Sequence, residues 1–186
     1  MPFAVTMRLD DGAADRIRKM WLNLSRIGLA LDCLVPRNEP HVTLAVLESY
    51  DDVEEIRSIV VRFAPGLSQV TLEFHAIGVY LGLGSALCLL ATPNIAMLKM
   101  QEKLVRQLRN GRVGLHYTAG NWTPHVTLSR EIRQVELIAK GIEMLAGTWE
   151  PLVCVARRLE LVRYLPVSVL ETVPLASTPP STKDTL

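Results

Sequence analysis

Hydrophobic and polar residues follow two different periods along the chain, and the period changes repeatedly. Stretches that alternate residue by residue are typical of strands, whereas apolar residues recurring every three or four positions are typical of amphipathic helices. The strand-like stretches are residues 3–9, 40–44, 69–80, 85–91, 124–128, 149–164 and 167–173. The helix-like stretches are residues 13–29, 51–63, 93–109 and 131–146. The predicted element order is therefore β-α-β-α-β-β-α-β-α-β-β.

Residues with strong positional preferences mark the ends of several elements. Residues 10–12, Asp-Asp-Gly, end the first strand and offer an N-cap to the first helix. Gly82 and Gly84 lie between two strands, so we interpret them as a hairpin turn rather than a phosphate-binding loop. Thr92 is expected to cap the third helix and Pro93 to open it.

This element order restricts the fold class. It lacks the regular β-α alternation of a doubly wound sheet, and it is not an all-β pattern. It predicts an α+β fold with mainly antiparallel sheets and helices packed outside. A chain of 186 residues is long enough for one good core. We expect a single domain over residues 1–175 and a disordered tail, rich in Ser, Thr and Pro, over residues 176–186.

One five-residue segment occurs twice. Residues 40–44 read Pro-His-Val-Thr-Leu, and residues 124–128 repeat it 84 positions later. About 0.01 such coincidences are expected by chance in a chain of this length. On a strand, His41 and Thr43 share a face, while the valine and leucine of the motif point the other way into a core. Each copy thus presents an imidazole beside a hydroxyl on an apolar strand.

Composition and charge restrict the partners and the cellular compartment that we expect for this protein. The net charge is +1, so the surface lacks the field that would attract nucleic acid or membranes strongly. Cys33, Cys88 and Cys154 are odd in number and widely spaced, which indicates buried free thiols rather than disulfides or a zinc site. The N-terminus does not resemble a signal peptide, and no apolar run reaches about 18 residues. We expect a cytoplasmic protein that does not bind membranes, and we favour a monomer.

The repeated motif suits acid–base chemistry on a phosphate. If the two copies face each other across a cleft, two imidazoles flank one point. With an ordinary pKa of about 6.5, one can be neutral and take a proton while the other is protonated and gives one. Thr43 and Thr127 can donate hydrogen bonds to the phosphate, and Arg130 can add a charge-assisted bond. We expect the imidazoles about 5–8 Å apart, as proton transfer on both sides of one phosphate requires.

The chain resembles the 2H phosphoesterase superfamily, which includes 2′,5′-RNA ligase-like proteins and 2′,3′-cyclic nucleotide phosphodiesterases. The resemblance rests on two His-x-Thr motifs on strands about 80 residues apart, and it covers the chain to about residue 175. It implies a bilobal fold of two pseudo-symmetric halves, with both motifs lining a central cleft. It also implies hydrolysis or transesterification of RNA-type phosphodiesters, namely 2′,3′-cyclic phosphates or 2′,5′-linked nucleotides, without a metal or cofactor.

By this resemblance, His41 and His125 are the acid–base pair and Thr43 and Thr127 hold the phosphate. Arg130 matches an arginine that often follows the second motif, whereas Ala45-Val46-Leu47 after the first motif contains no basic residue. Because the motifs are identical, the sequence does not distinguish the acid from the base.

A nucleotide or RNA end needs aromatic partners for its bases. Tyr117 and Trp122 flank the second motif on a glycine-containing loop at residues 111–123, and both are candidates for substrate binding. Plain packing is the alternative for each. We interpret His116, on the same loop, as a solvated loop residue, with a mobile lid as the alternative.

Two alternatives to an enzyme remain at this stage. The same cleft can bind a nucleotide or RNA end without turnover. Alternatively, the chain is an interaction protein with a vestigial site, in which case the two histidines lie on different surfaces. A metal centre is disfavoured, because two histidines without a nearby carboxylate or thiol cluster are too few ligands.

Overall fold

A computed structural model describes residues 2–48, 52–82, 84–108, 113–164 and 166–177. Four α-helices and seven strands lie in this part of the chain, in the order predicted from the sequence. The helices are α1 (Asp11–Ser25), α2 (Val53–Phe63), α3 (Ile95–Gln107) and α4 (Val135–Ala146). The strands are β1 (Phe3–Leu9), β2 (His41–Leu47), β3 (Val70–Tyr80), β4 (Ser85–Ala91), β5 (His125–Ile132), β6 (Leu152–Tyr164) and β7 (Val167–Pro174). Two short 3-10 helices, η1 (Ala64–Gly66) and η2 (Leu115–Tyr117), complete the described elements.

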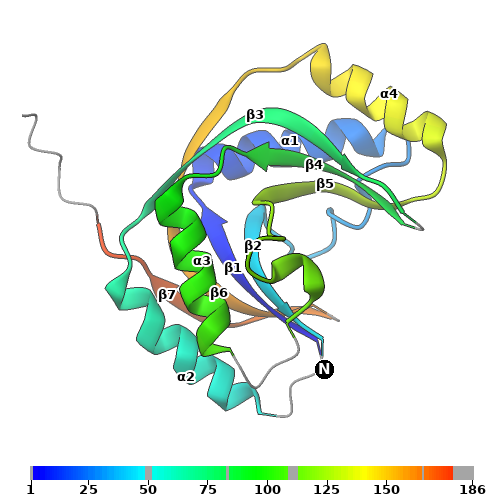
Figure 1. Ribbon diagram of the computed structural model, residues 1–186. Coiled ribbons are helices and arrows are strands. Elements are labelled where there is room, and N and C mark those ends of the chain that lie inside the picture. Colours follow the sequence, from blue (N-terminus) through cyan, green and yellow to red (C-terminus); the bar gives the residue numbers. More distant parts are fainter. Residues whose placement is uncertain (1, 49–51, 83, 109–112, 165, 178–186) are drawn as a thin grey trace, which may run out of the picture.

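The strands form one antiparallel sheet in the order β2-β1-β6-β3-β4-β5, with β7 paired to β6. If β1, β2 and β3 are swapped with β4, β5 and β6, the order becomes β5-β4-β3-β6-β1-β2, which is the same order read from the other end. The first and second halves of the chain are therefore related by a pseudo-two-fold. Each half contributes its last strand, β3 or β6, to the other half (Figure 1). This confirms the expected α+β fold of two similar halves with mainly antiparallel strands.

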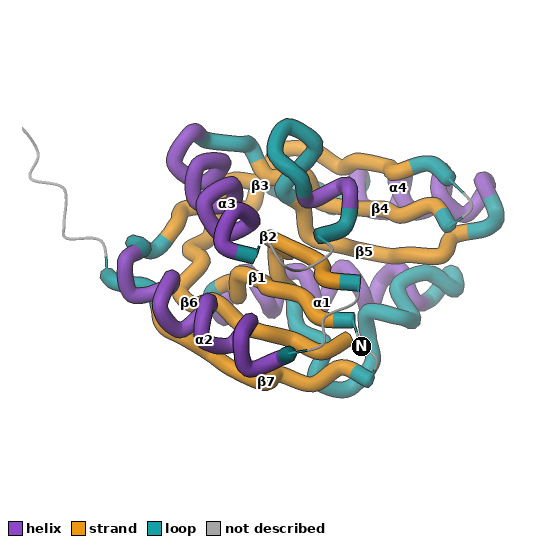
Figure 2. The backbone as a smooth tube through the Cα atoms, turned by 60° about the horizontal axis from the view of Figure 1, so that its bottom comes forward, coloured by secondary structure: helices purple, strands orange, loops and turns teal. Residues whose placement is uncertain are grey.

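The two ends of the sheet meet. β2 and β5, the outermost strands of this order, contact each other and lie side by side in the middle of the molecule (Figures 1 and 2). α3 packs on β2 and α1 packs on β5. α2 lies against β6 and β7, and α4 against α1 and β5. Because β2 and β5 begin with the two His-x-Thr motifs, the curvature of the sheet brings the motifs together.

The motif strands alternate as the sequence predicts. Val42, Leu44, Val126 and Leu128 are at most 1% exposed and belong to the core, whereas the His and Thr of each motif are half-buried. Burying such a side chain contributes about 1.5–3 kcal/mol relative to its exposure. A shift of register by one residue would move all four out of the core, so the apolar residues fix the direction of the imidazoles.

Three predicted helix boundaries were wrong. α3 is capped by Asn94, whose side chain accepts from the Met97 amide, and not by Thr92, whose amide continues the sheet by donating to the Glu73 carbonyl. α4 begins at 135 rather than 131, because β5 continues to Ile132, which pairs with Ser85. α1 ends at Ser25 rather than 29.

Other boundaries agree with the sequence. Asp10 caps α1 by accepting from the Ala13 amide, and Asp52 caps α2, while Asp51 lies outside the described residues. At the C-terminus, Ala176 still pairs with Ser68, so hydrogen-bonded structure extends one residue into the expected tail. Residues 178–186 of that tail lie outside the described residues. None of the described helices has both the length and the apolar character needed to span a membrane.

Candidate active site

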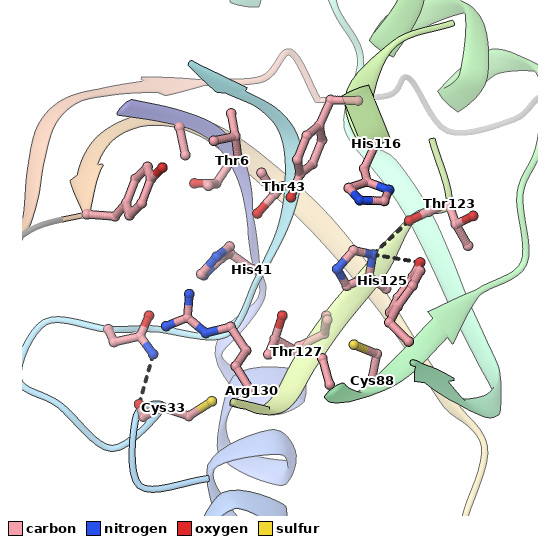
Figure 3. A pocket seen from close by; sticks show the side chains of 18 of the residues that line it. Thr6, Cys33, His41, Thr43, Cys88, His116, Thr123, His125, Thr127 and Arg130 are labelled. Carbon is pink, nitrogen blue, oxygen red and sulfur yellow. Dashed lines mark hydrogen bonds between the residues drawn. The ribbon is translucent and has the colours of Figure 1, made fainter. Parts of the chain in front are cut away.

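Both motifs line one cavity of about 540 Å³ (Figure 3). His41 and Thr43 enter it from β2, and His125 and Thr127 enter it from β5. The volume lies within the range of small-molecule sites. Two side-chain pairs that are 84 residues apart in the chain therefore share one solvent-accessible space. This contradicts the hypothesis of a vestigial site with the histidines on different surfaces.

Each imidazole is held through its Nδ1 atom. His41 Nδ1 lies 2.5 Å from the carbonyl oxygen of Glu39, and His125 Nδ1 lies 2.8 Å from that of Thr123. A carbonyl oxygen only accepts hydrogen bonds, so Nδ1 carries the proton in both rings. In the neutral rings Nε2 therefore has the free lone pair, and it is the nitrogen available for proton exchange.

A tryptophan anchors each motif strand at its threonine. The Trp21 indole on α1 donates to the Thr127 carbonyl, and the Trp122 indole donates to the Thr43 carbonyl, both at 3.0 Å. Each indole comes from the half of the chain opposite to the strand that it anchors. Both tryptophans are buried and also line the cavity. Trp122 thus packs against the fold and borders the site at once.

Tyr117 borders the cavity beside Thr43. Burial raises the pKa of Tyr117 to about 12, against an opposing effect from a hydrogen bond with Thr43. The phenol is therefore neutral near pH 7 and can donate or accept a hydrogen bond. His116, interpreted from the sequence as a solvated loop residue, lies on η2 and lines the cavity although it is exposed.

Arg130 reaches the cavity from the end of β5. Its Nε lies 2.8 Å from Asp32 Oδ2, in an ion pair that joins β5 to the loop after α1. Figure 3 shows the guanidinium pointing toward His41. The pairing at Nε leaves the two terminal nitrogens as the donors directed at the cavity, a geometry suited to phosphate oxygens.

Burial lowers the pKa of both histidines. Around His41, the positive charges of Arg130 and Arg8 lower the pKa further, and around His125 the neighbouring His116 does so. The bond to the Glu39 or Thr123 carbonyl acts in the opposite direction. Both free imidazoles therefore favour the neutral state more than an ordinary histidine does.

The structure adds cavity residues that the sequence does not assign to the site. They include Thr6, Asn38, Tyr80, Cys88 and Tyr164. Thr6 pairs with Thr43 across β1 and β2, and Cys88 pairs with Thr127 across β4 and β5, so the pseudo-two-fold relates them. No local pattern marks them, because their position depends on which strand pairs with which.

The three cysteines are buried free thiols, as the sequence predicts. Burial raises the pKa of Cys33, Cys88 and Cys154 to about 12, so each remains a neutral thiol near pH 7. In the part of the chain that the structure describes, no three His, Cys, Asp or Glu side chains converge as a metal site would require.

Comparison with known families gives a match over most of the chain. The model of the 2′-5′ RNA ligase superfamily matches residues 9–167, a segment that contains both motifs. The chain belongs to the 2′-5′ RNA ligase superfamily. This places it among the 2H phosphoesterases and confirms the resemblance drawn from the sequence. No curated protein matches the chain significantly.

Solved structures of this superfamily's fold are similar to the chain. TT0787 of Thermus thermophilus matches with a TM-score of 0.65 and 15% identity, over 94% of this chain and 98% of that one. Escherichia coli LigT complexed with 3′-AMP matches with a TM-score of 0.60 and 16% identity, over 95% and 99% of the two chains. At these identities the likeness establishes a common fold.

Proposed function

We propose that this superfamily member is a phosphoesterase that acts on a 2′,3′-cyclic phosphate or a 2′,5′-linked nucleotide, with His41 and His125 as general acid and base. The observation that carries the proposal is the pair of matched imidazoles in one cavity, each bonded through Nδ1 to a backbone carbonyl. This bond orients Nε2 and stabilises the ring when it becomes protonated.

Hydrolysis of a cyclic phosphate then proceeds in line. The neutral histidine takes a proton from water as the water oxygen forms a bond to phosphorus. The bond from phosphorus to one ribose oxygen breaks, and the protonated histidine gives that oxygen its proton. The two rings exchange protonation states, and proton exchange with solvent restores them. These steps need only two histidines and donors for the phosphate oxygens, so we propose that the reaction is metal-independent.

The other cavity residues are assigned to substrate binding. Thr43 and Thr127 lie beside the histidines and are donors for non-bridging oxygens, and Arg130 neutralises the phosphate charge. Trp122 and Tyr117 present aromatic surface to the cavity and are the candidates for base or ribose contacts.

Ligands of similar structures support a nucleotide substrate. Escherichia coli LigT has been crystallised with 3′-AMP, with ATP and with NADP+. These molecules share a nucleoside and a phosphate, the two parts that the cavity offers to hold. We also propose that the protein is cytoplasmic and monomeric; the three buried free thiols fit a reducing compartment.

The test is a panel of 2′,3′-cyclic mononucleotides, cyclic-ended RNA and 2′,5′-dinucleotides, each incubated with and without EDTA. We expect release of a 2′- or 3′-monophosphate product, unaffected by the chelator. An unchanged ligand that stays bound for hours would instead favour the alternative of a nucleotide- or RNA-end-binding module. Loss of turnover in EDTA, restored by added metal, would refute the metal-independent mechanism.

A further inference from the structure

The two histidines have equivalent hydrogen bonds but different surroundings. Arg8 is the β1 residue paired with His41 across the β1–β2 ladder, and Arg130 points toward the same ring from β5 (Figure 3). Both guanidinium groups are charged at any relevant pH. Each is ion-paired, Arg8 with Glu39 and Arg130 with Asp32, and both still lower the pKa of His41.

Glu39 fixes Arg8 in place. A terminal nitrogen of Arg8 lies 2.9 Å from Glu39 Oε2, and the same carboxylate bonds Arg18 of α1. The backbone carbonyl of Glu39 accepts the His41 Nδ1 proton. One residue thus holds the cation with its side chain and the imidazole with its backbone.

Glu160 and Arg158 of β6 are the other charged groups near Arg8. Glu160 is 8% exposed, lies 3.8 Å from Arg158 and also interacts electrostatically with Arg8. The Arg8 side chain is only 12% exposed, so its charge is weakly screened by solvent. Among the arginine neighbours of His41, Arg8 is the more buried one, because the Arg130 side chain is 56% exposed.

Around His125 the main neighbour is an aromatic ring. The Tyr80 ring centroid lies 5.1 Å from that of His125 with an interplanar angle of 54°, and the Tyr80 hydroxyl lies 3.4 Å from His125 Nδ1. Burial raises the pKa of Tyr80, so the phenol is uncharged near pH 7. An aromatic ring at this distance attracts a cation.

The titratable groups that face His125 add little positive charge. His116 approaches from η2 and is exposed to solvent, which screens it. Cys88 of β4 is a neutral thiol near pH 7. His41 lines the same cavity, and a positive charge on His125 lowers the pKa of His41 slightly.

We propose that Arg8, held by Glu39, and Tyr80 are positioning residues that make the two histidines unequal, so that the first proton taken up by the site lies on His125 while His41 stays neutral.

The test is an NMR titration of the protein labelled with 15N-histidine, without substrate, with resonances assigned from His41→Ala and His125→Ala. We expect His125 to be protonated at higher pH than His41. Equal midpoints, or a higher midpoint for His41, would overturn the proposal. This readout needs no activity, so it can fail while the enzyme is active, or hold while the proposed reaction is absent.

Substitutions at Arg8 test what causes the difference between the two midpoints. Arg8→Gln is expected to raise the His41 midpoint by about 0.5–1 pH unit and to change that of His125 less. Arg8→Lys keeps the charge and should leave the order intact. Arg16→Gln, which removes an exposed cation paired with Glu150, is the matched control and should change neither midpoint.

At the other histidine, Tyr80→Leu removes the ring and is expected to lower the His125 midpoint, whereas Tyr80→Phe keeps the ring and should retain it. An unaltered His125 midpoint in Tyr80→Leu would show that Tyr80 does not favour the proton on His125. Equal shifts of both histidines in Arg8→Gln would show that Arg8 does not cause the difference between them. If Arg8→Gln does not fold, the wild-type titration and the two Tyr80 variants still decide the proposal.

Discussion

Each candidate catalytic imidazole is held through its Nδ1 atom. The carbonyl that accepts from Nδ1 belongs in both cases to the residue two positions earlier, Glu39 or Thr123. The extended approach to each motif therefore supplies the anchor for its own histidine. A substitution at either histidine removes the proton carrier, whereas a substitution at its neighbours changes the pKa or the binding of substrate.

The lowered pKa values of His41 and His125 predict the pH dependence of kcat/KM. Below the lower pKa both rings are protonated and no base remains; above the higher pKa both are neutral and no acid remains. Since burial lowers both pKa values in the free protein, the bell-shaped profile should peak below about pH 6.5, the ordinary histidine value. Measuring kcat/KM from about pH 4 to 9 checks this. A plateau that continues above about pH 8 would contradict it.

Arg130 should contribute to the binding of the phosphate. Arg130→Gln removes a charge-assisted hydrogen bond worth about 1.5–3 kcal/mol, so kcat/KM should fall by about 10- to 100-fold. Steady-state kinetics on the best cyclic nucleotide measures the loss. Arg106→Gln is the matched control, because Arg106 makes an exposed ion pair with Glu102 on α3. Equal activity of the two variants would exclude Arg130 from the site.

At the scale of elements, the motif strands depend on contacts from the opposite half of the chain. Trp21 and Trp122 anchor the carbonyls of Thr127 and Thr43, and the Gln101 side chain of α3 donates to the Leu44 carbonyl. These bonds fix the backbone of β2 and β5 where the sheet closes on itself. The site is therefore built on rigid elements, which keeps the two imidazoles in register with each other.

Trp122→Phe should destabilise the fold without removing a catalytic group. The substitution keeps an aromatic ring but leaves the Thr43 carbonyl without its indole donor, at a cost of about 1–3 kcal/mol. Urea denaturation followed by circular dichroism measures the change in unfolding free energy. Trp149→Phe, at a partly buried tryptophan outside the motifs, should cost less. A Trp122→Phe variant as stable as the wild type would show that the anchor is dispensable.

At the scale of the whole molecule, the sequence predicts the order of elements but not their pairing. Strand and helix periods depend on local burial, and Asp10 and Asp52 mark two helix starts correctly. The exchange of β3 and β6 between halves leaves no local trace, because each strand is apolar enough to pair with several others. The same reason explains the wrong limits of α3 and α4, where pairing with distant strands extends the sheet into predicted helix.

The same contrast between local sequence patterns and long-range pairing applies to the candidate site. His41, Thr43, His125 and Thr127 are predictable because a repeat and a two-residue period mark them, and the structure places all four in one cavity. Trp122 and Tyr117 also line it, as their place beside the second motif suggested. Residues such as Asp32, 98 positions from its partner Arg130, carry no sequence signal, since only the fold creates their contact.

The central claim is that His41 and His125 act as one acid–base pair on a phosphate between them. The most direct measurement is the turnover of a 2′,3′-cyclic nucleotide by the wild type, by His41→Ala, by His125→Ala and by the double variant. We predict that each single variant loses about 10²- to 10⁴-fold in kcat and that the double variant loses little more, because the two groups act in one step. Full turnover by either single variant would contradict the account.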